Sequence, residues 1–240
     1  NVGKSTLVNA VVGEKIAAVS DKPNTTRNRI VGIRNLPDAQ LIFLDTPGIH
    51  KARGKLGKVM VQAAMSAVRE ADVILMMVEI KEPFGKGDTF IIESLPKPAI
   101  LLINKIDKIK KGEILKIIAE SRKYQDKFLE IIPISAAMSD GIPELLTAIR
   151  NHLPPGPKYF PDDMITDQPE RFLAAEFIRE KIFNLTHQEI PYKIAVSIEE
   201  FEEVPEKQLI HISAVIYVER ANHKGIIIGK GGEMLKEIGS

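Results

Sequence analysis

Short apolar runs alternate with longer amphipathic segments over the first 153 residues of the chain. The apolar runs predict strands at 29–34, 40–44, 72–78, 99–103 and 129–133. Helical periodicity is found at 4–12, 57–70, 112–127 and 143–152. Strands that alternate with helices form βαβ units, so the pattern predicts a three-layer α/β/α domain with a mostly parallel sheet. The segment 35–39 is short enough for a hairpin, so we expect one antiparallel edge pair.

A proline-rich segment ends this alternation. Five prolines lie within residues 154–169, and such a stretch continues neither a helix nor a central strand. Beyond it, the pattern predicts a helix at 170–185, strands at 194–202 and 209–219, and a helical segment interrupted at 229–232. We therefore predict an α/β domain over 1–153, a linker over 154–169 and a smaller α+β domain over 170–240.

Composition excludes several classes of protein. The 240 residues include no cysteine, which excludes disulfides, thiolate zinc sites and cysteine nucleophiles. The longest apolar run, 73–78, is far too short to span a bilayer. The net charge of +1 is unevenly distributed, since residues 160–240 carry nine Lys and Arg against fifteen Asp and Glu, whereas 1–159 carry 24 against 17. The acidic excess lies in the C-terminal part.

The chain opens with Asn-Val-Gly-Lys-Ser-Thr, the last part of a G-x-x-x-x-G-K-[ST] phosphate loop. Gly3 lets backbone N–H groups approach phosphates, Lys4 reaches the β and γ oxygens, and Ser5 ligates Mg²⁺. The alternative is a turn glycine followed by Lys-Ser by chance. The predicted phosphate-binding residues are Asn1, Val2, Gly3, Lys4, Ser5 and Thr6. We expect the first strand, with the first loop glycine, to be absent from this chain.

Asp45-Thr-Pro-Gly48 follows the apolar run 40–44. A carboxylate at a strand end can hold Mg²⁺ through water. Gly48 has no side chain to block its N–H from a γ-phosphate. Alone, this motif is better explained by a strand followed by a Pro-Gly turn. Together with the phosphate loop, it predicts a γ-phosphate sensor at Asp45 and Gly48.

Two further motifs follow predicted strands, Asn104-Lys105-Ile-Asp107 and Ser135-Ala136. Doubly wound sheets bind ligands at the carboxyl ends of their strands. Asp107 can accept from both N1–H and the exocyclic amine of guanine, and adenine offers no such donor pair. The stem of Lys105 can cover the base, and the N–H of Ala136 can reach the guanine oxygen. The four motifs resemble the P-loop GTPases, which implies GTP or GDP and Mg²⁺ as ligands.

That resemblance places the last Mg²⁺ ligand in Pro23-Asn-Thr-Thr-Arg27, where Thr26 is expected and Thr25 is the alternative. The Mg²⁺ ligands would then be Ser5, Thr26 and Asp45, and the catalytic residues Lys4, Thr26 and Gly48. Ile49 replaces the glutamine that orients water in Ras-like members and cannot form a hydrogen bond. The bacterial GTPases with a hydrophobic residue here bind K⁺ with the equivalent of Asn1, which implies slow turnover that K⁺ accelerates.

Residues 225–232, Gly-Ile-Ile-Ile-Gly-Lys-Gly-Gly, contain a G-x-x-G turn between two predicted helices. With the two preceding strands, this order resembles a type II KH domain, whose turn clamps about four single-stranded nucleotides. A purely structural turn is the alternative, and the local acidic excess opposes RNA binding. We expect the rest of this domain, with further basic residues, beyond Ser240. The predicted RNA-binding residues are Ile226, Ile228, Gly229, Lys230, Gly231 and Gly232.

The GTPase motifs, the proline-rich segment, Gln-Pro-Glu-Arg-Phe-Leu-Ala-Ala-Glu at 168–176 and the KH motif together resemble the Era family of bacterial GTPases. The resemblance implies a monomeric switch that binds the 3′ end of 16S rRNA and acts in assembly of the 30S subunit. It also implies a cytoplasmic protein with peripheral contact at the inner membrane. The alternatives are a GTPase of the tRNA-modification or tandem-GTPase type, and an RNA-binding module whose nucleotide domain is only structural.

Overall fold

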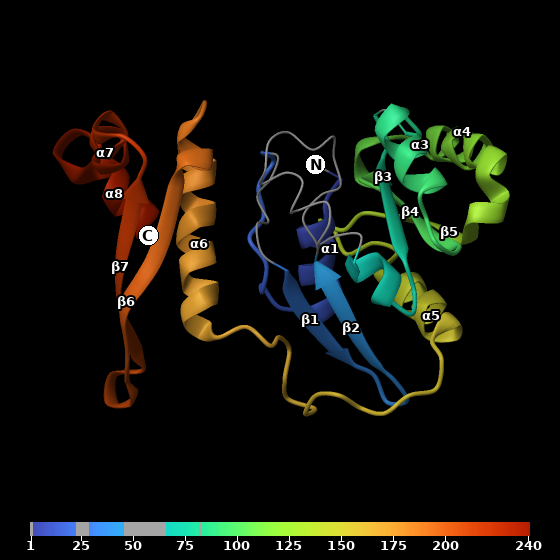
Figure 1. Cartoon of the computed structure of the whole chain (residues 1–240), viewed down its shortest axis with the longest axis horizontal. Helices are drawn as coiled ribbons and strands as arrows, with labels where there is room; N and C mark the ends of the chain where they lie inside the picture. The colour runs from blue at the N-terminus through green and yellow to red at the C-terminus, as the bar shows by residue number, and fades with distance from the viewer. Residues whose placement is uncertain (1, 23–28, 46–65, 82) are drawn as a thin grey trace. The chain divides into compact units, whose positions relative to one another are not determined.

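The computed structural model describes residues 2–22, 29–45, 66–81 and 83–240 (Figure 1). The chain forms two compact units. The first unit comprises Asn1–Lys15 and Thr26–Asp167, and the second comprises Ile16–Thr25 and Gln168–Ser240. The second unit therefore includes a short segment from near the start of the chain, which the sequence pattern did not predict.

The first unit contains the predicted parallel sheet. Its strands are β3 (Leu75–Glu79), β4 (Ala99–Asn104) and β5 (Phe128–Ile134), in the order β3-β4-β5. The predicted hairpin is also present, formed by β1 (Ile30–Asn35) and β2 (Gln40–Asp45), which pair in antiparallel register. Every residue of β4 is buried, as expected for a central strand with both faces covered. The α/β fold class predicted for this part is confirmed.

The helices of the first unit are α1 (Lys4–Val12), α3 (Lys86–Glu93), α4 (Lys111–Ser121) and α5 (Ile142–His152). Of the helix predicted over 57–70, only 66–70 lies within the described residues, and it is helical. The α3 helix was not predicted, because it is short and buries only Ile92. The helix predicted over 112–127 ends earlier, since Tyr124 has a non-helical φ of −120° within the 3₁₀ segment Arg122–Lys127. The Tyr124 ring packs 5.8 Å from that of Phe84.

The segment predicted as a linker, 154–169, is hydrogen-bonded to the β1–β2 hairpin. The N–H of Ile33 donates to the carbonyl of Ile165 at 2.8 Å, and the Thr166 hydroxyl donates to the carbonyl of Val31 at 2.7 Å. At the other end of the hairpin, the Gln40 side chain donates to the carbonyl of Phe160 at 2.9 Å. Prolines therefore prevent regular structure in this segment without preventing its packing against β1 and β2.

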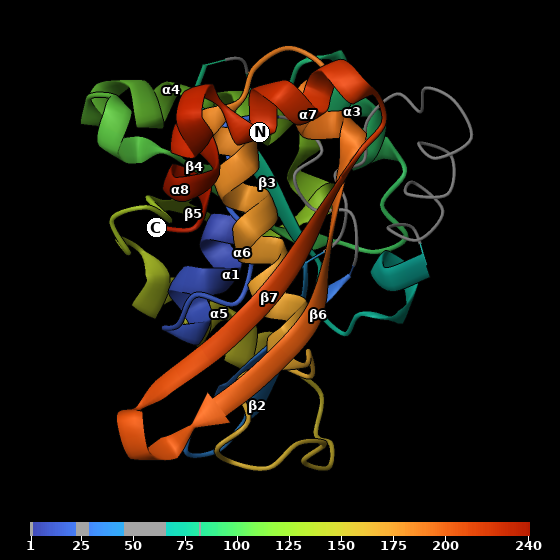
Figure 2. The same ribbon diagram turned by 90° about the vertical axis from the view of Figure 1, so that its left-hand side faces the viewer.

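The second unit is built on a long helix, α6 (Glu170–Leu185), and a hairpin of β6 (Ile194–Val204) and β7 (Leu209–Val218) (Figure 2). Two short helices follow, α7 (Ala221–Ile228) and α8 (Glu233–Ile238). Their shared core contains Ile182, Ile190, Ile194, Ile227 and Ile238. The predicted α+β class is confirmed. No helix in the described part of the chain is long and apolar enough to cross a membrane.

Lys22 holds residues 16–22 to the end of α6 in the second unit. The ammonium of Lys22 donates to the backbone carbonyls of Phe183 and Thr186. Carbonyls at a helix C-terminus lack partners within the helix and carry partial negative charge, so a cation is favourable there. Ile16, Ala17 and Ala18 are also buried. A segment near the N-terminus is thereby part of the C-terminal unit.

The buried β4 strand provides a test of the core. We expect Leu101→Ala to lower the free energy of unfolding by about 2–5 kcal/mol, because Leu101 is fully buried and its truncation leaves a cavity. Leu115→Ala is the matched control, since Leu115 is 66% exposed on α4, and should change it by less than about 0.5 kcal/mol. Urea unfolding measures both, and equal effects would contradict the assigned core.

Candidate functional site

The end of the phosphate loop requires a glycine at position 3. Gly3 precedes α1 and has a left-handed backbone, with φ 102° and ψ 28°. A Cβ on Gly3 would overlap the Asn104 side chain. Both the backbone conformation and the close approach exclude other residues. The predicted loop residues Val2, Lys4, Ser5 and Thr6 lie at this start of α1, whereas Asn1 lies outside the described residues.

The side chain of Asn104 connects three of the predicted motifs. Its amide nitrogen donates to the carbonyl of Val2 at 2.7 Å, and its amide oxygen accepts from the N–H of Ala136 at 3.0 Å. Asn104 is only 2% exposed, and its hydrogen bond with Ala136 is buried, whereas the bond to Val2 is partly buried. The phosphate loop, the end of β4 and the Ser135 turn are thereby brought together, as the strand-end positions predicted.

The predicted guanine motif lies at the same edge of the sheet. The Ser135 hydroxyl donates to the Asp107 carboxylate at 2.6 Å. Lys105 has a left-handed backbone with φ 70°, which is rare outside glycine and often marks functional positions. The N–H of Ala136, predicted to reach the guanine oxygen, donates to Asn104 in this structure.

Glu79 is a residue of this site that the sequence reasoning missed. It ends β3 and stands beside Asn104 in the parallel register, and its carboxylate pairs with the Lys105 ammonium at 2.6 Å. The hydrogen bond from Lys105 lowers the pKa of Glu79. The pair fixes the direction of the Lys105 side chain. Its only sequence signal was its position at the carboxyl end of a predicted strand, one residue beyond the predicted boundary.

The predicted Mg²⁺ ligands Ser5 and Asp45 also meet. The Ser5 hydroxyl donates to the Asp45 carboxylate at 2.7 Å, and Asp45 is 2% exposed. Burial lowers the pKa of Lys4, and the neighbouring Asp45 charge opposes that shift. One hydroxyl and one carboxylate suit Mg²⁺, which usually keeps waters and uses few protein ligands. Thr25, Thr26, Gly48 and Ile49 lie outside the described residues, so their predicted roles stay predictions.

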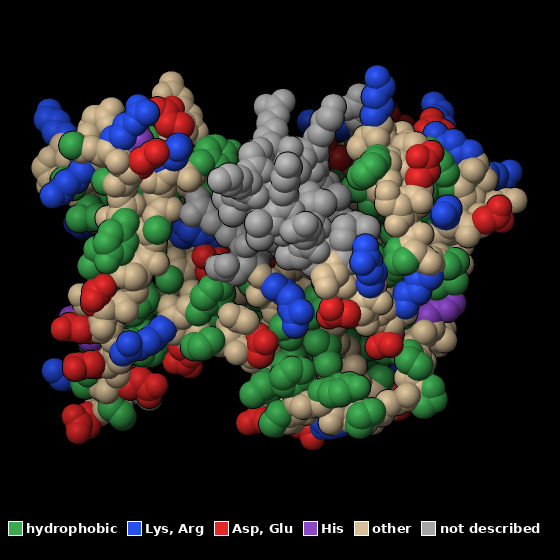
Figure 3. Space-filling view, in the orientation of Figure 1, with side chains coloured by type: hydrophobic (Ala, Val, Ile, Leu, Met, Phe, Trp, Pro, Cys, Tyr) green, Lys and Arg blue, Asp and Glu red, His purple; other side chains and the backbone are tan. Residues whose placement is uncertain are grey.

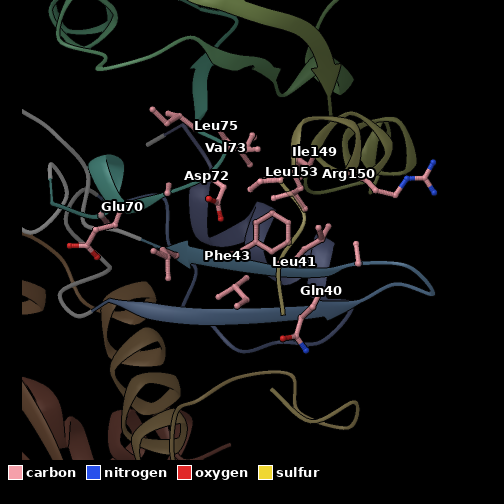
Figure 4. Close-up of a pocket in the computed structure, with 18 of the residues that line it drawn as sticks. Gln40, Leu41, Phe43, Glu70, Asp72, Val73, Leu75, Ile149, Arg150 and Leu153 are labelled. Carbon is pink, nitrogen blue, oxygen red and sulfur yellow. The ribbon is translucent and has the colours of Figure 1, made fainter. Parts of the chain in front are cut away.

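A cavity of about 920 Å³ lies between the edges of β2 and β3 (Figure 4). Helices α1 and α5 contribute to its walls, and Lys4 and Asp45 also border it. The cavity therefore adjoins the predicted phosphate and Mg²⁺ residues at one end, and its lining combines charged and apolar side chains. The side chains that dominate it are Leu41, Phe43, Val73, Leu75, Ile149 and Leu153.

The predicted RNA-binding turn joins α7 and α8 in the second unit. Gly229, Gly231 and Gly232 all have positive φ, of 73°, 62° and 86°. A Cβ on Gly231 or Gly232 would meet nothing within 4 Å, so a ligand backbone has room to approach there. Lys230 is exposed within the turn. Ile226 and Ile228 are 45% and 38% exposed, whereas Ile227 between them is buried in the core.

Comparison with known proteins identifies relatives along the whole chain. A family model described as 50S ribosome-binding GTPase matches residues 1–105, and a KH domain model matches residues 189–240. The GTPase Era of Geobacter metallireducens is 53% identical, over 100% of this chain and 81% of that protein. The GTPase Era of Syntrophus aciditrophicus is 53% identical, over 100% of this chain and 79% of that protein.

Two solved structures resemble the whole chain. Era in complex with MgGDPNP and nucleotides 1506–1542 of 16S ribosomal RNA superposes with a TM-score of 0.92 at 45% identity. An Era variant from Aquifex aeolicus bound to GDP·AlF₄⁻ gives a TM-score of 0.93 at 45% identity. Each match covers 100% of this chain and 82% of the other.

The Asn104 bridge can be tested by substitution. We expect Asn104→Ala to weaken GDP binding and to lower the free energy of unfolding by about 1–3 kcal/mol, because the N–H of Ala136 stays buried without an acceptor. Asn104→Asp keeps that acceptor but cannot donate to Val2, so it should retain more stability yet still weaken GDP binding. Calorimetric titration and urea unfolding measure the two effects.

The partly exposed Asn35 provides the control, since its amide donates to the carbonyl of Asp162 at 2.9 Å. Asn35→Ala should leave GDP affinity unchanged. If both Asn104 variants bound GDP as tightly as the wild-type protein does, the Asn104 bridge would not be what organises the site.

Proposed function

Because this chain belongs to the Era family of GTPases, we propose that it is a GTP-dependent switch that binds the 3′ end of 16S rRNA. It binds GTP with Mg²⁺, hydrolyses it to GDP and phosphate, and acts in assembly of the 30S ribosomal subunit. The observation that carries the GTPase part is the Asn104 bridge, which joins the phosphate loop to the guanine motif.

The proposed residue roles follow the motifs. Main-chain groups of Val2, Gly3 and Thr6, with the Lys4 ammonium, bind the phosphates, and Ser5, Asp45 and Thr26 hold Mg²⁺. Gly48 senses the γ-phosphate. Base recognition belongs to Asn104, Lys105, Asp107, Ser135 and Ala136. Bound Mg²⁺ neutralises the charge that develops on the phosphate oxygens, and the buried Lys4 contributes a second positive charge there.

RNA recognition is assigned to the turn between α7 and α8. Gly231 and Gly232 leave room for the sugar-phosphate chain, Lys230 provides a phosphate contact, and exposed Ile226 and Ile228 lie under the bases. The acidic balance of residues 160–240 opposes phosphate binding, so we assign the phosphate contact to the lysine within the glycine turn itself.

The domain organisation that we propose is a GTPase domain over 1–153, a connecting segment over 154–169 and a KH domain over 170–240. We also propose a monomer that acts in the cytoplasm, with peripheral contact at the inner membrane.

The segment 16–22 supports coupling between the two ligands. Lys22 attaches this segment to the end of α6 in the second unit, and the predicted Mg²⁺-binding threonines follow it in the sequence. Ordering of Thr26 by GTP would therefore act on a segment anchored in the RNA-binding unit. By linkage, RNA must alter GTP affinity by the same factor.

RNA binding tests the function directly. We expect a labelled RNA from the 16S 3′ end to bind the full-length protein more tightly with GTP analogue than with GDP. Lys230→Asp should weaken binding by about tenfold and reduce its salt dependence, because a phosphate contact is lost. Lys207→Asp, an equal charge change on the exposed 3₁₀ turn Pro205–Lys207, is the control and should leave the affinity unchanged.

The two results can be judged separately. No RNA binding in either nucleotide state would remove the ribosomal assignment and leave a GTPase. Equal RNA affinity in both states would reject the coupling.

Hydrolysis should depend on the monovalent cation. With Ile49 unable to position water, we expect turnover in the full-length protein to be about tenfold or more faster in K⁺ than in Na⁺, because K⁺ offsets phosphate charge. Asn1→Ala should remove most of this difference without abolishing GDP binding. A phosphate-release assay in matched KCl and NaCl measures the two turnover rates. Identical rates in the two salts would contradict the proposed role of K⁺.

A further inference from the structure

The ammonium of Lys105 is held by a carboxylate from another strand. Glu79 ends β3 and stands beside Asn104 in the parallel register, so it lies next to the residue that follows β4. The Lys105 Nζ and the Glu79 Oε2 are 2.6 Å apart. Their side chains are 29% and 31% exposed, so water reaches the pair only in part. The contact fixes the end of a side chain whose four-carbon stem is otherwise flexible.

The backbone of Lys105 also constrains this side chain. Lys105 has φ 70° and ψ 33°, a left-handed conformation that is rare for residues other than glycine. Its carbonyl accepts from the N–H of Lys108 at 3.0 Å, across the 3₁₀ turn Ile106–Lys108 that carries Asp107. Such a backbone persists only where surrounding contacts stabilise it, and the pair with Glu79 is one of them.

Asp107 is supported from a different side. Its carboxylate accepts from the Ser135 hydroxyl at 2.6 Å, and Ser135 directly follows β5. Lys105 is thus attached to β3 and Asp107 to the turn after β5, on the two sides of the central strand β4. Loss of the Glu79 carboxylate would therefore release the Lys105 side chain and leave Asp107 in place. Covering the base and hydrogen bonding to it are separable in this site.

The Glu79 carboxylate lies near a mostly basic part of the first unit. Residues 105–127 contain eight Lys and Arg against four Asp and Glu. Figure 3 shows several Lys and Arg side chains at its upper right, over α3 and α4. The hydrogen bond from Lys105 lowers the pKa of Glu79, burial opposes that shift, and the charges of Lys105 and Lys81 reinforce it. The carboxylate is therefore ionised at neutral pH, where it holds the ammonium.

We propose that Glu79 is a positioning residue that holds the stem of Lys105 across the face of the bound guanine and so slows the release of GDP. The aliphatic stem covers the base while its ammonium stays on the carboxylate. Release of the nucleotide requires the stem to move aside, which breaks the pair. A base beneath the stem also excludes water, and the two charges attract each other more strongly with less water around them. The inference rests on the proposed guanine site, and Glu79 acts on it through Lys105.

Release of fluorescently labelled GDP from the full-length protein with Mg²⁺ measures this effect. Glu79→Gln keeps the shape of the side chain and removes its charge. We expect it to speed dissociation about fivefold, because a weaker neutral hydrogen bond replaces a charge-assisted one.

Glu130→Gln is the matched control. Glu130 lies on β5, is 42% exposed and contacts His152 at 2.9 Å, so the same substitution removes a comparable surface pair. It stands in register with Ile100, toward the other end of β4 from Asn104. We expect Glu130→Gln to change the rate of GDP release by less than about twofold.

A double-mutant cycle tests whether Glu79 acts through Lys105. Lys105→Met keeps an unbranched apolar stem and removes the ammonium, so it should also speed GDP release. Adding Glu79→Gln to Lys105→Met should have no further effect, because the cation that the carboxylate holds is gone. If Glu79→Gln speeds release equally in the wild-type and Lys105→Met backgrounds, Glu79 acts by another route and the proposal is wrong.

Selectivity for guanine provides a readout that a general loss of structure would change. Inosine diphosphate lacks the exocyclic amine from which Asp107 is proposed to accept. We expect Glu79→Gln to weaken GDP and inosine diphosphate alike and to keep the ratio of their affinities within about twofold, because Ser135 still holds Asp107. A changed ratio, or GDP release at the wild-type rate, would overturn the inference. Failure of the wild-type protein to bind GDP would instead overturn the proposed function, and this inference with it.

Discussion

A single buried amide organises the nucleotide site. Asn104 donates to the loop that precedes α1 and accepts from the turn that follows β5, so one side chain uses both of its polar atoms to join segments far apart in sequence. Burial makes the loss of the bond from Ala136 costly, because that N–H cannot turn to water instead. The glycine at position 3 is the steric counterpart of this arrangement, since only a residue without a side chain fits against the amide.

The position of this site was predictable from the sequence, because parallel strands place their carboxyl ends at one edge of a sheet. Apolar runs located β3, β4 and β5, and the polar residues after them therefore had to converge. Details that depend on tertiary contacts were not predictable. Helix α4 ends at Ser121, and the following 3₁₀ segment places Tyr124 against Phe84. The docking of 159–166 comes from hydrogen bonds to β1 and to Gln40.

The local sequence pattern also did not predict which residues belong to the second unit. Residues 16–22 show no strong periodicity. They belong to the second unit because Lys22 donates to two carbonyls at the end of α6, more than 160 residues away. Contacts of this kind depend on where a helix ends in space, which spacing along the chain does not encode. Glu79 was missed for a related reason, since its role appears only when its strand is aligned with β4.

Strand β6 has a β-bulge between Ile198 and Glu200, and the extra residue decides which side chains beyond it lie on each face of the hairpin. Inserting or deleting one residue beside Ile198 would exchange the faces of every later side chain of β6, while β7 and the core would keep theirs. A charged face could thus become apolar, or the reverse, in one mutational step that leaves the folded centre intact. Relatives that differ in length at this point would present different surfaces on the same framework, so a change of binding partner need not disturb either the nucleotide site or the glycine turn.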